Sequence, residues 1–536
     1  MNASAFVLLL CTFAAQAAAP DPARTRAYID HAWDTLTRSM DDCSALVDAK
    51  VTTRPVLYLP ADMQAPAALD AITAHCKIDV HVLPQRIAAL GELSPTRLPV
   101  QGLLYLPHPY VVPGGFFNEM YGWDSYFIVL GLLADQRFAM ARDMVENQLF
   151  EVEHYGGVLN ANRSYYLTRS QPPFLSQMMR AVIDDKSGFR DAYAAQAWLA
   201  RAYPLAVRDH DIWTRPEHAA GDTGLARYFD YGSGPVPEMR DARYLQGAIK
   251  WLRAHPAQDP GYLFKAPSRQ DANDTASPAL SGCDVRASQV CADATFDGYR
   301  LLADFFLGDR AMRESGFDTT FRFGPYAGST HHYAAVDLNS LLYRYELDLA
   351  DFARRLGRGD DAQRWDAAAA SRRAAMDRYL WCAACGMYYD YDFIAGKRSD
   401  YAFIATFYPL WAGAASPTQA AAVRGKLADF ERRGGLLTSI NESGAQWDAP
   451  FGWAPTNWLA IAGLDAAGFH DDARRVAARF TATIDRSLDA DATIREKYNM
   501  VSGDAKVEIK AGYTTNVIGF GWTNGVYLKL QELMKH

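Results

Sequence analysis

The sequence predicts an all-α fold, organised as one large domain. Apolar residues recur at intervals of three and four over residues 29–40, which is the pattern of a helix with one buried face. The same spacing returns over residues 476–488, behind a pair of aspartates at 471–472 that suits a helix start. Alternating runs are scarce. Residues 78–82 do alternate, but one short strand cannot build a sheet.

The first nineteen residues are expected to be a signal peptide. They contain no charged side chain, and an apolar core at 5–15 is followed by small residues at 15–17 that suit cleavage. Export to the periplasm or secretion follows from this interpretation. Lys and Arg are absent from the start of the segment, which leaves a short uncleaved hydrophobic anchor as the alternative.

The rest of the chain shows no composition shift that marks an internal boundary. We therefore expect a helical N-terminal extension at 20–95 and a main domain at 96–536. A further helix is predicted over 418–433, ended by the glycine pair at 434–435. A ring of stacked helical hairpins is one architecture that sustains a domain of this size.

Composition excludes several classes of protein. The 536 residues carry 54 Lys and Arg against 62 Asp and Glu, a net charge of −8, which argues against a nucleic-acid binder. Past residue 20 no apolar run reaches the length needed to cross a bilayer. No membrane span is expected once the leader is removed. Aromatic residues make up 12% of the chain, a content often found where clefts bind sugar-like ligands.

The cysteines favour structural disulfides in an oxidising compartment. Of seven cysteines, Cys11 lies in the leader, and the other six are an even number. Proximity along the chain suggests the pairs Cys43–Cys76, Cys283–Cys291 and Cys382–Cys385, although spacing alone does not fix the pairing. The last pair is also readable as a redox or zinc motif, but a single CxxC without a second pair or a nearby His disfavours zinc. The polar stretch at 270–291 is expected to be a surface insertion closed by a disulfide.

Two loops combine acidic and aromatic residues with turn formers. Residues 113–126 read PGGFFNEMYGWDSY, and residues 446–458 read QWDAPFGWAPTNW. Aromatic faces stack on pyranose rings while carboxylates, amides and guanidinium groups pair with ring hydroxyls, so a sugar site needs both kinds of side chain. These loops therefore favour a carbohydrate-binding cleft.

The two loops resemble the two signature sequences of the glycoside hydrolase family 37 trehalases. The resemblance runs from about Leu103 to Leu528 and includes further matching blocks at 160–173, 314–318, 336–339, 390–392, 496–498 and 519–526. It implies a six-hairpin (α/α)6 toroid and hydrolysis of α,α-trehalose to two glucose molecules in a catalytic domain at 96–536. It implies neither a metal nor an organic cofactor.

The resemblance also implies the catalytic pair. Asp318 would be the general acid that protonates the glycosidic oxygen, and Glu496 the general base that activates water. Such a pair inverts the configuration of the anomeric carbon when water fits between its carboxyl groups. The residues alone do not single these two out from the 62 acidic side chains.

The expected sugar-contacting residues also follow from matching positions. Arg169 can donate a fork of hydrogen bonds to neighbouring hydroxyls, and Asp124 and Glu238 can accept from them. For Trp447 and Trp453, a place in the cleft wall and plain packing stay open. The full set is Phe116, Trp123, Asp124, Asn160, Arg169, Ser170, Gln171, Glu238, Gly316, Trp447 and Trp453.

The chain departs from the family pattern at three places. Phe116 and Val236 stand where the family has arginines, and residues 502–512 replace a Gly-rich lid. The expected function is an exported, monomeric inverting trehalase that binds a disaccharide. The alternatives are the same chemistry on another α-linked glucoside, and a sugar-binding protein without turnover. Lys506 and Lys510 are candidates to compensate for the lost arginines.

Overall fold

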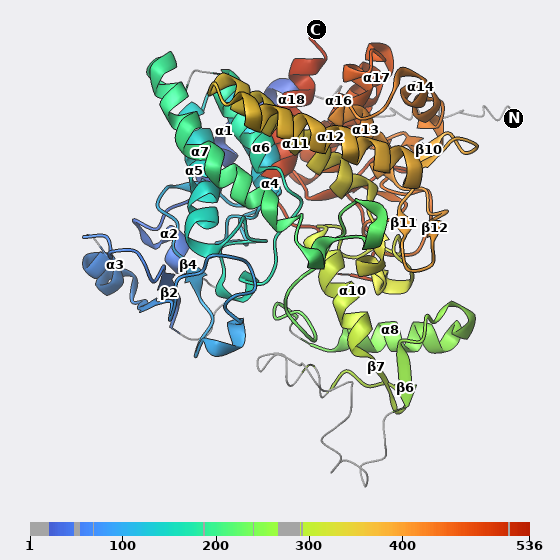
Figure 1. Ribbon diagram of the computed structural model, residues 1–536, viewed down its shortest axis with the longest axis horizontal. Helices are drawn as coiled ribbons and strands as arrows, with labels where there is room; N and C mark the ends of the chain where they lie inside the picture. The colour runs from blue at the N-terminus through green and yellow to red at the C-terminus, as the bar shows by residue number, and fades with distance from the viewer. Residues whose placement is uncertain are drawn as a thin grey trace, which may run out of the picture.

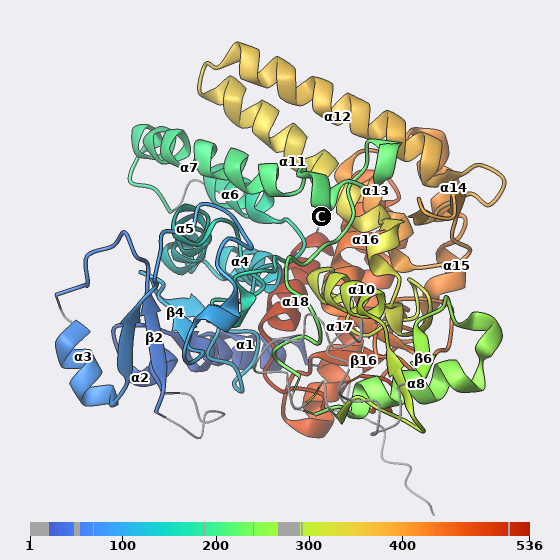
Figure 2. The same ribbon diagram turned by 60° about the horizontal axis from the view of Figure 1, so that its bottom comes forward.

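The computed structural model describes residues 21–535, apart from 48–53, 68, 186–187, 240, 266–289, 291–292 and 513–514. Six helices in this part form a closed inner ring, in which each contacts the next and the last contacts the first (Figures 1 and 2). In order around the ring they are α4 (Asp124–Ala134), α6 (Leu175–Asp185), α11 (Val336–Arg355), α13 (Tyr408–Ala412), α16 (Ala454–Ala466) and α18 (Gly521–Leu533).

Each inner helix follows an outer helix along the chain. The outer helices are α1 (Pro22–Leu36), α5 (Phe138–Tyr155), α7 (Ala192–Ile212), α12 (Gly359–Tyr379), α14 (Pro417–Arg424) and α17 (His470–Asp491). The ring closes because α1 contacts α17 and α18. This arrangement confirms the predicted all-α fold and its six helical hairpins.

The sequences of the helices explain which of them lie inside. In α4 every residue from Asp124 to Leu132 is buried, as expected for a helix that is apolar nearly all round. Helix α17 buries one stripe, which includes the residues of the predicted pattern at 476–488. Glycine lets α4 and α18 approach closely: a Cβ on Gly131 would lie 2.3 Å from the Cα of Gly525.

The N-terminal region differs from the predicted helical extension, because it includes a parallel sheet. The alternating run at 78–82 forms β3 (Asp79–Val82), which pairs with β2 (Val56–Leu59), and β2 pairs in turn with β4 (Leu103–Leu104). All four residues of β2 are buried, so this strand has no alternation to reveal it. Helices α2 (Cys43–Leu46) and α3 (Leu69–Cys76) complete the region.

The predicted helix at 418–433 is also corrected. Helix α14 ends at Arg424, and α15 (Leu427–Phe430) is only one turn long. The chain then turns into a hairpin of β13 (Glu431–Arg432) and β14 (Gly435–Leu436). The interruption falls at Gly425, which caps α14, so the helical pattern does not continue through it.

Short strand pairs lie in the segments that lead from an outer helix to the following inner helix, as the two aromatic loops do. They are β1 (Thr37–Arg38) with β5 (Tyr110–Val111), β9 (Trp381–Cys382) with β10 (Met387–Tyr388), β11 (Tyr391–Asp392) with β12 (Lys397–Arg398) and with β8 (Tyr333–Ala334), and β15 (Phe451–Trp453) with β16 (Lys497–Asn499). A small outlying unit contains α8 (Arg243–Ala254) and the pair β6 (Leu263–Lys265) and β7 (Tyr299–Leu301), next to α10 (Ala303–Glu314) (Figure 1).

Two of the three predicted disulfides are present. Cys43 is bonded to Cys76 and Cys382 to Cys385. The pair Cys283–Cys291, nearly all of the predicted insertion at 270–291 and the predicted leader at 1–19 lie outside the described residues. Within the described residues, no helix is both long and apolar enough to cross a bilayer.

Candidate active site

Three acidic side chains from distant parts of the chain meet at this site. Asp124 is the first residue of α4, Asp318 follows α10, and Glu496 directly precedes β16. Burial raises the pKa of Asp124 well above its usual range, and the negative charges of Glu496 and Asp318 raise it further. The structure therefore brings the two predicted catalytic residues into electrostatic range of one predicted sugar-contacting carboxyl.

Asp318 has the properties of a proton donor. Burial raises the pKa of its carboxyl to about 7, while the positive charges of Arg313 and Arg169 oppose that rise. The Arg313 Nη1 atom lies 3.7 Å from Asp318 Oδ2, and the Asp318 side chain keeps 29% of its surface exposed. At neutral pH a large fraction of the carboxyl groups would hold a proton and remain accessible to a ligand.

The second aromatic loop holds the backbone around this acid. The Gln446 side-chain amide donates to the carbonyl of Asp318, and the Trp447 backbone N–H donates to the carbonyl of Thr319 over 3.1 Å. Gly316, two residues earlier, has φ +75°, and a Cβ there would lie 2.9 Å from the ring of Trp123. The loop can take this path only with glycine at that position.

Glu496 is buried, and neighbouring groups hold both its side chain and its backbone. It is 2% exposed, and its Oε2 atom accepts a hydrogen bond from Lys497 Nζ over 2.8 Å. The Trp522 indole donates to the carbonyl of Glu496 over 3.2 Å, and the Glu496 N–H donates to Val517 over 3.0 Å. Burial lowers the pKa of Lys497, while the charge of Glu496 opposes this shift. The Lys497 ammonium group thus holds the Glu496 side chain in place by a buried ion pair.

Arg169 and Glu238 form an ion pair beside the acid. Arg169 Nη2 donates to Glu238 Oε1 over 2.5 Å. Burial would raise the pKa of Glu238, but the charges of Arg169 and Arg313 hold it below its usual value. Arg169 Nε and Glu238 Oε2 are buried without a partner among the described residues, which leaves one donor and one acceptor suited to sugar hydroxyls.

The three smaller polar residues of the predicted set mainly position the loops. Ser170 Oγ donates to the carbonyl of Val158 over 2.6 Å. Gln171 Oε1 accepts from the backbone N–H of Trp123 over 3.0 Å. Asn160 donates its backbone N–H to the carbonyl of Arg169 over 2.9 Å. Direct contact of these three side chains with a sugar stays a prediction.

The aromatic residues are packed more deeply than a cleft wall requires. Trp447 and Trp453 stack with ring centroids 3.9 Å apart, and each is at most 1% exposed. Trp123 is 2% exposed, and its ring meets those of Trp447 and Trp522. Of the two readings left open for the tryptophan pair, the structure therefore favours packing. Phe116 differs, because 57% of its surface is exposed.

Two charged residues at the site escaped the sequence prediction. Lys497 directly follows the predicted base, and Arg313 lies five residues before the predicted acid. Arg313 is 15% exposed and also contacts Asp309 one turn earlier. Lys506 and Lys510, the predicted compensating cations, are exposed instead. Arg313 thus places a guanidinium group close to Asp318, in addition to that of Arg169.

Removal of the Arg313 charge is expected to change the pH profile of hydrolysis at this site. The positive charge lowers the pKa of Asp318, so Arg313→Ala raises it, and the fall of kcat/KM on the alkaline side moves to higher pH. If the guanidinium also binds a hydroxyl, kcat/KM decreases by about 10–100-fold, as for one lost charge-assisted hydrogen bond. Arg313→Lys keeps the charge and the pH position. Lys510→Ala is the control, and an unmoved profile in Arg313→Ala contradicts the assignment.

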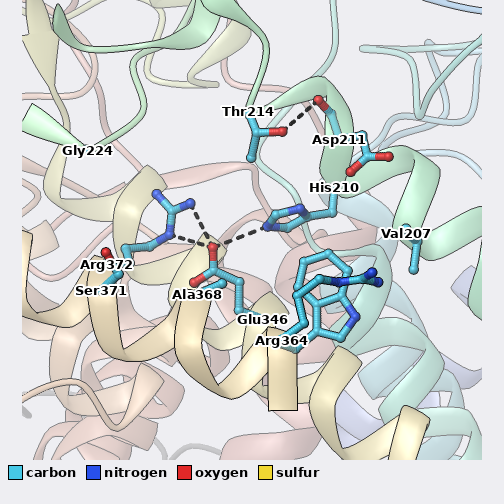
Figure 3. Close-up of a pocket in the computed structure, with 11 residues that line it drawn as sticks. Val207, His210, Asp211, Thr214, Gly224, Glu346, Arg364, Ala368, Ser371 and Arg372 are labelled. Atoms are coloured by element: carbon cyan, nitrogen blue, oxygen red, sulfur yellow. Dashed lines mark hydrogen bonds and ion pairs between the residues drawn. The ribbon is translucent and has the colours of Figure 1, made fainter. Parts of the chain in front are cut away.

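A cavity of about 530 Å³ lies between α7, α11 and α12, and neither Asp318 nor Glu496 lines it (Figure 3). Glu346 stands at its centre and accepts hydrogen bonds from Arg372 over 2.8 and 2.9 Å, while His210 Nε2 lies 3.3 Å away. None of the residues predicted for the site lines this cavity. This cavity is therefore distinct from the predicted active site.

Comparisons with known proteins place the chain in a family. The trehalase family model matches residues 11–287 and 299–535. A probable trehalase of Eremothecium gossypii is 34% identical over 94% of this chain and 72% of its own length. A cytosolic neutral trehalase of Neurospora crassa is 33% identical over 93% of this chain and 71% of its own. The solved structure of neutral trehalase Nth1 from Saccharomyces cerevisiae superposes with a TM-score of 0.77 and 31% identity, covering 96% of this chain and 94% of that one.

The predicted export, with its periplasmic or secreted location, is contradicted by these relatives. The Neurospora crassa protein is named cytosolic, and similar cytosolic neutral trehalases are found in Beauveria bassiana and Kluyveromyces lactis. The prediction depended on an apolar N-terminus that has no Lys or Arg before its core. Without that positive charge, the segment lacks one of the defining features of a signal peptide.

The helical ring, the acidic centre and the match of the family model over nearly the whole chain lead to one conclusion. This chain belongs to the trehalase family.

Proposed function

We propose that this protein hydrolyses α,α-trehalose to two molecules of glucose, with inversion at the carbon that is attacked. The observation that supports this most is the convergence of Asp318 and Glu496 on the buried carboxyl of Asp124. Burial raises the pKa of Asp318 to about 7, which favours its protonated form, whereas Glu496 is ion-paired with Lys497 at 2.8 Å. An inverting glycosidase needs one carboxyl group that donates a proton and a second that accepts one.

The proposed reaction is a single displacement. Asp318 gives its proton to the glycosidic oxygen as the bond to the anomeric carbon breaks. Glu496 takes a proton from the water that attacks the opposite face of the ring. Asp124, Arg169 and Glu238 hold the hydroxyls, and the negative charge around the ring stabilises the oxocarbenium-like transition state. These steps use only side chains of this chain and water.

A second candidate substrate class comes from the altered family positions. Phe116 offers an exposed apolar ring, and Val236 is fully buried, so neither can donate to a hydroxyl. A different α-linked disaccharide, with an apolar face toward Phe116, would suit this change. We favour trehalose because Arg313 supplies a guanidinium group close to Asp318. The monomeric state expected from the sequence stays a prediction.

The test is kcat/KM on trehalose beside kojibiose, nigerose, maltose and aryl α-glucosides. We expect trehalose to be preferred by at least about 10²-fold, since a site built to pair with hydroxyls rejects sugars that leave its polar groups unpaired. If another disaccharide is preferred, trehalose is not the substrate, but the proposed inverting hydrolysis still holds. Binding of trehalose without release of glucose from any sugar would refute the proposed enzyme.

A further inference from the structure

Two neighbouring histidines and an aspartate converge outside the catalytic site. Asp304 lies in the first turn of α10, and His331 and His332 end the short 3-10 helix η9 (Thr330–His332). His331 Nε2 lies 2.9 Å from Asp304 Oδ1, and His332 Nε2 lies 3.8 Å from Asp304 Oδ2. One ligand atom from each of the three residues lies within 4.8 Å of the other two.

These separations match those of a metal-ligand set. Zinc binds imidazole nitrogen and carboxylate oxygen at about 2.0–2.2 Å in tetrahedral geometry, which puts neighbouring ligand atoms about 3.3–3.6 Å apart. The two distances from the Asp304 oxygens, 2.9 and 3.8 Å, fall on either side of that value. Small side-chain rotations would be needed to bring one atom of each residue around a single ion, since the three already lie within 4.8 Å of one another.

The backbone that carries the histidines is already held in place. The carbonyl of His331 accepts from Arg227 Nη1 over 2.8 Å, and that of His332 accepts from the N–H of Phe393 over 3.1 Å. Thr330 Oγ1 donates to the carbonyl of Ala327 over 2.7 Å. Binding would therefore order little besides the side chains, which lowers its entropic cost.

Burial leaves one side of the cluster open. His331 is 4% exposed and His332 half-buried, whereas the Asp304 side chain is 47% exposed. Buried His331 Nδ1 has no hydrogen-bond partner among the described residues, while Nε2 points to the aspartate. An ion could thus enter from the Asp304 side and keep a water molecule as its fourth ligand, as in zinc sites with three protein ligands.

We propose that Asp304, His331 and His332 bind one late first-row divalent metal ion, with zinc as the representative. Two imidazoles and one carboxylate suit zinc, nickel, copper or cobalt, whereas magnesium and calcium prefer oxygen ligands alone. The three ligands enclose a segment of the chain, since Asp304 and His331 are 27 positions apart. Arg313 and Asp318 lie within that segment, so the ion would tie the loop that carries the proposed acid to the start of α10.

The ion is expected to act on stability rather than on the chemical step. A ligand that binds only the folded chain raises the free energy of unfolding as its concentration exceeds the Kd. None of the three ligand residues belongs to the proposed catalytic set. Zinc should therefore raise the unfolding temperature of the intact protein while leaving kcat on trehalose nearly unchanged.

The test is to measure zinc binding to the full-length, untagged protein by titration calorimetry and metal analysis. We expect about one zinc per chain, and at least a tenfold increase in Kd for Asp304→Asn and for His332→Ala. The control is His470→Ala. His470 also contacts an aspartate, with its Nδ1 atom 2.7 Å from Asp465 Oδ1, but this His–Asp pair is not part of a three-residue cluster among the described residues. This control should bind zinc as the parent does.

Two further measurements separate a built site from general surface binding. Cobalt should give the intense visible absorption of tetrahedral coordination in the parent and lose it in both ligand variants. Zinc should raise the unfolding temperature of the parent and of His470→Ala but not of Asp304→Asn. Unchanged zinc binding in the two ligand variants, absence of any binding by the parent, or equal competition by magnesium would each overturn the proposal.

Discussion

Asp318→Asn is expected to lower kcat on trehalose by about 10⁴-fold, at the upper end of what general acid catalysis contributes. The glucose that departs is a poor leaving group unless its oxygen is protonated, and an amide has no proton to give at neutral pH. The change is nearly isosteric, so the unfolding temperature should stay the same. Turnover measured with coupled glucose detection, alongside thermal unfolding, provides the comparison.

The leaving group offers a sharper test of the same residue. Fluoride departs without protonation, so Asp318→Asn should hydrolyse α-glucosyl fluoride far better than trehalose. Asp209→Asn is a matched control, because burial raises the pKa of Asp209 to about 6 although this residue is not part of the site. If Asp209→Asn loses as much activity as Asp318→Asn, the loss reflects a disturbed core. If fluoride rescues nothing in Asp318→Asn, this residue is not the acid.

Glu496→Gln is expected to lower kcat by about 10³–10⁴-fold on trehalose and on α-glucosyl fluoride alike. The loss is independent of the leaving group, because the attacking water no longer has a base to accept its proton. Azide needs no base, so added azide should restore reaction with the fluoride and form β-glucosyl azide. The measurement is product identification by NMR in parent and variant.

The two variants should therefore differ: α-glucosyl fluoride as the substrate restores turnover in Asp318→Asn, whereas Glu496→Gln needs added azide as well. If Glu496→Gln hydrolysed α-glucosyl fluoride well without azide, Glu496 would be the acid and not the base. Lys497 loses its charged partner in this variant, so thermal unfolding must show an intact fold before the kinetics are compared. A folded Glu496→Gln variant with parental activity would remove Glu496 from the mechanism.

The helical architecture was predictable because burial leaves a clear pattern in the outer helices. Ile29, Trp33 and Leu36 are all buried on α1, as their spacing predicts. The N-terminal sheet was not predictable in the same way. Its central strand β2 is buried throughout and therefore shows no alternation, and one of its partners, β4, lies more than forty residues further along the chain.

The proposed catalytic pair followed only from the family resemblance, and the structure adds the surroundings of its two side chains. A sequence does not show that burial raises the pKa of Asp318 or that Lys497 turns toward Glu496. Arg313 was missed for a similar reason. Its spacing from Asp309 is that of an ordinary ion pair along a helix, and only the fold directs its guanidinium group to Asp318.

The most direct test of the account is the anomeric form of glucose in the first moments of trehalose hydrolysis, followed by ¹H NMR before mutarotation. Inversion releases one glucose as the β-anomer, and the departing glucose keeps its α configuration. We therefore predict equal initial amounts of α- and β-glucose, made by the parent protein and not by Asp318→Asn or Glu496→Gln. Initial release of α-glucose alone would show retention, and would contradict a mechanism in which Glu496 activates water against a bond protonated by Asp318.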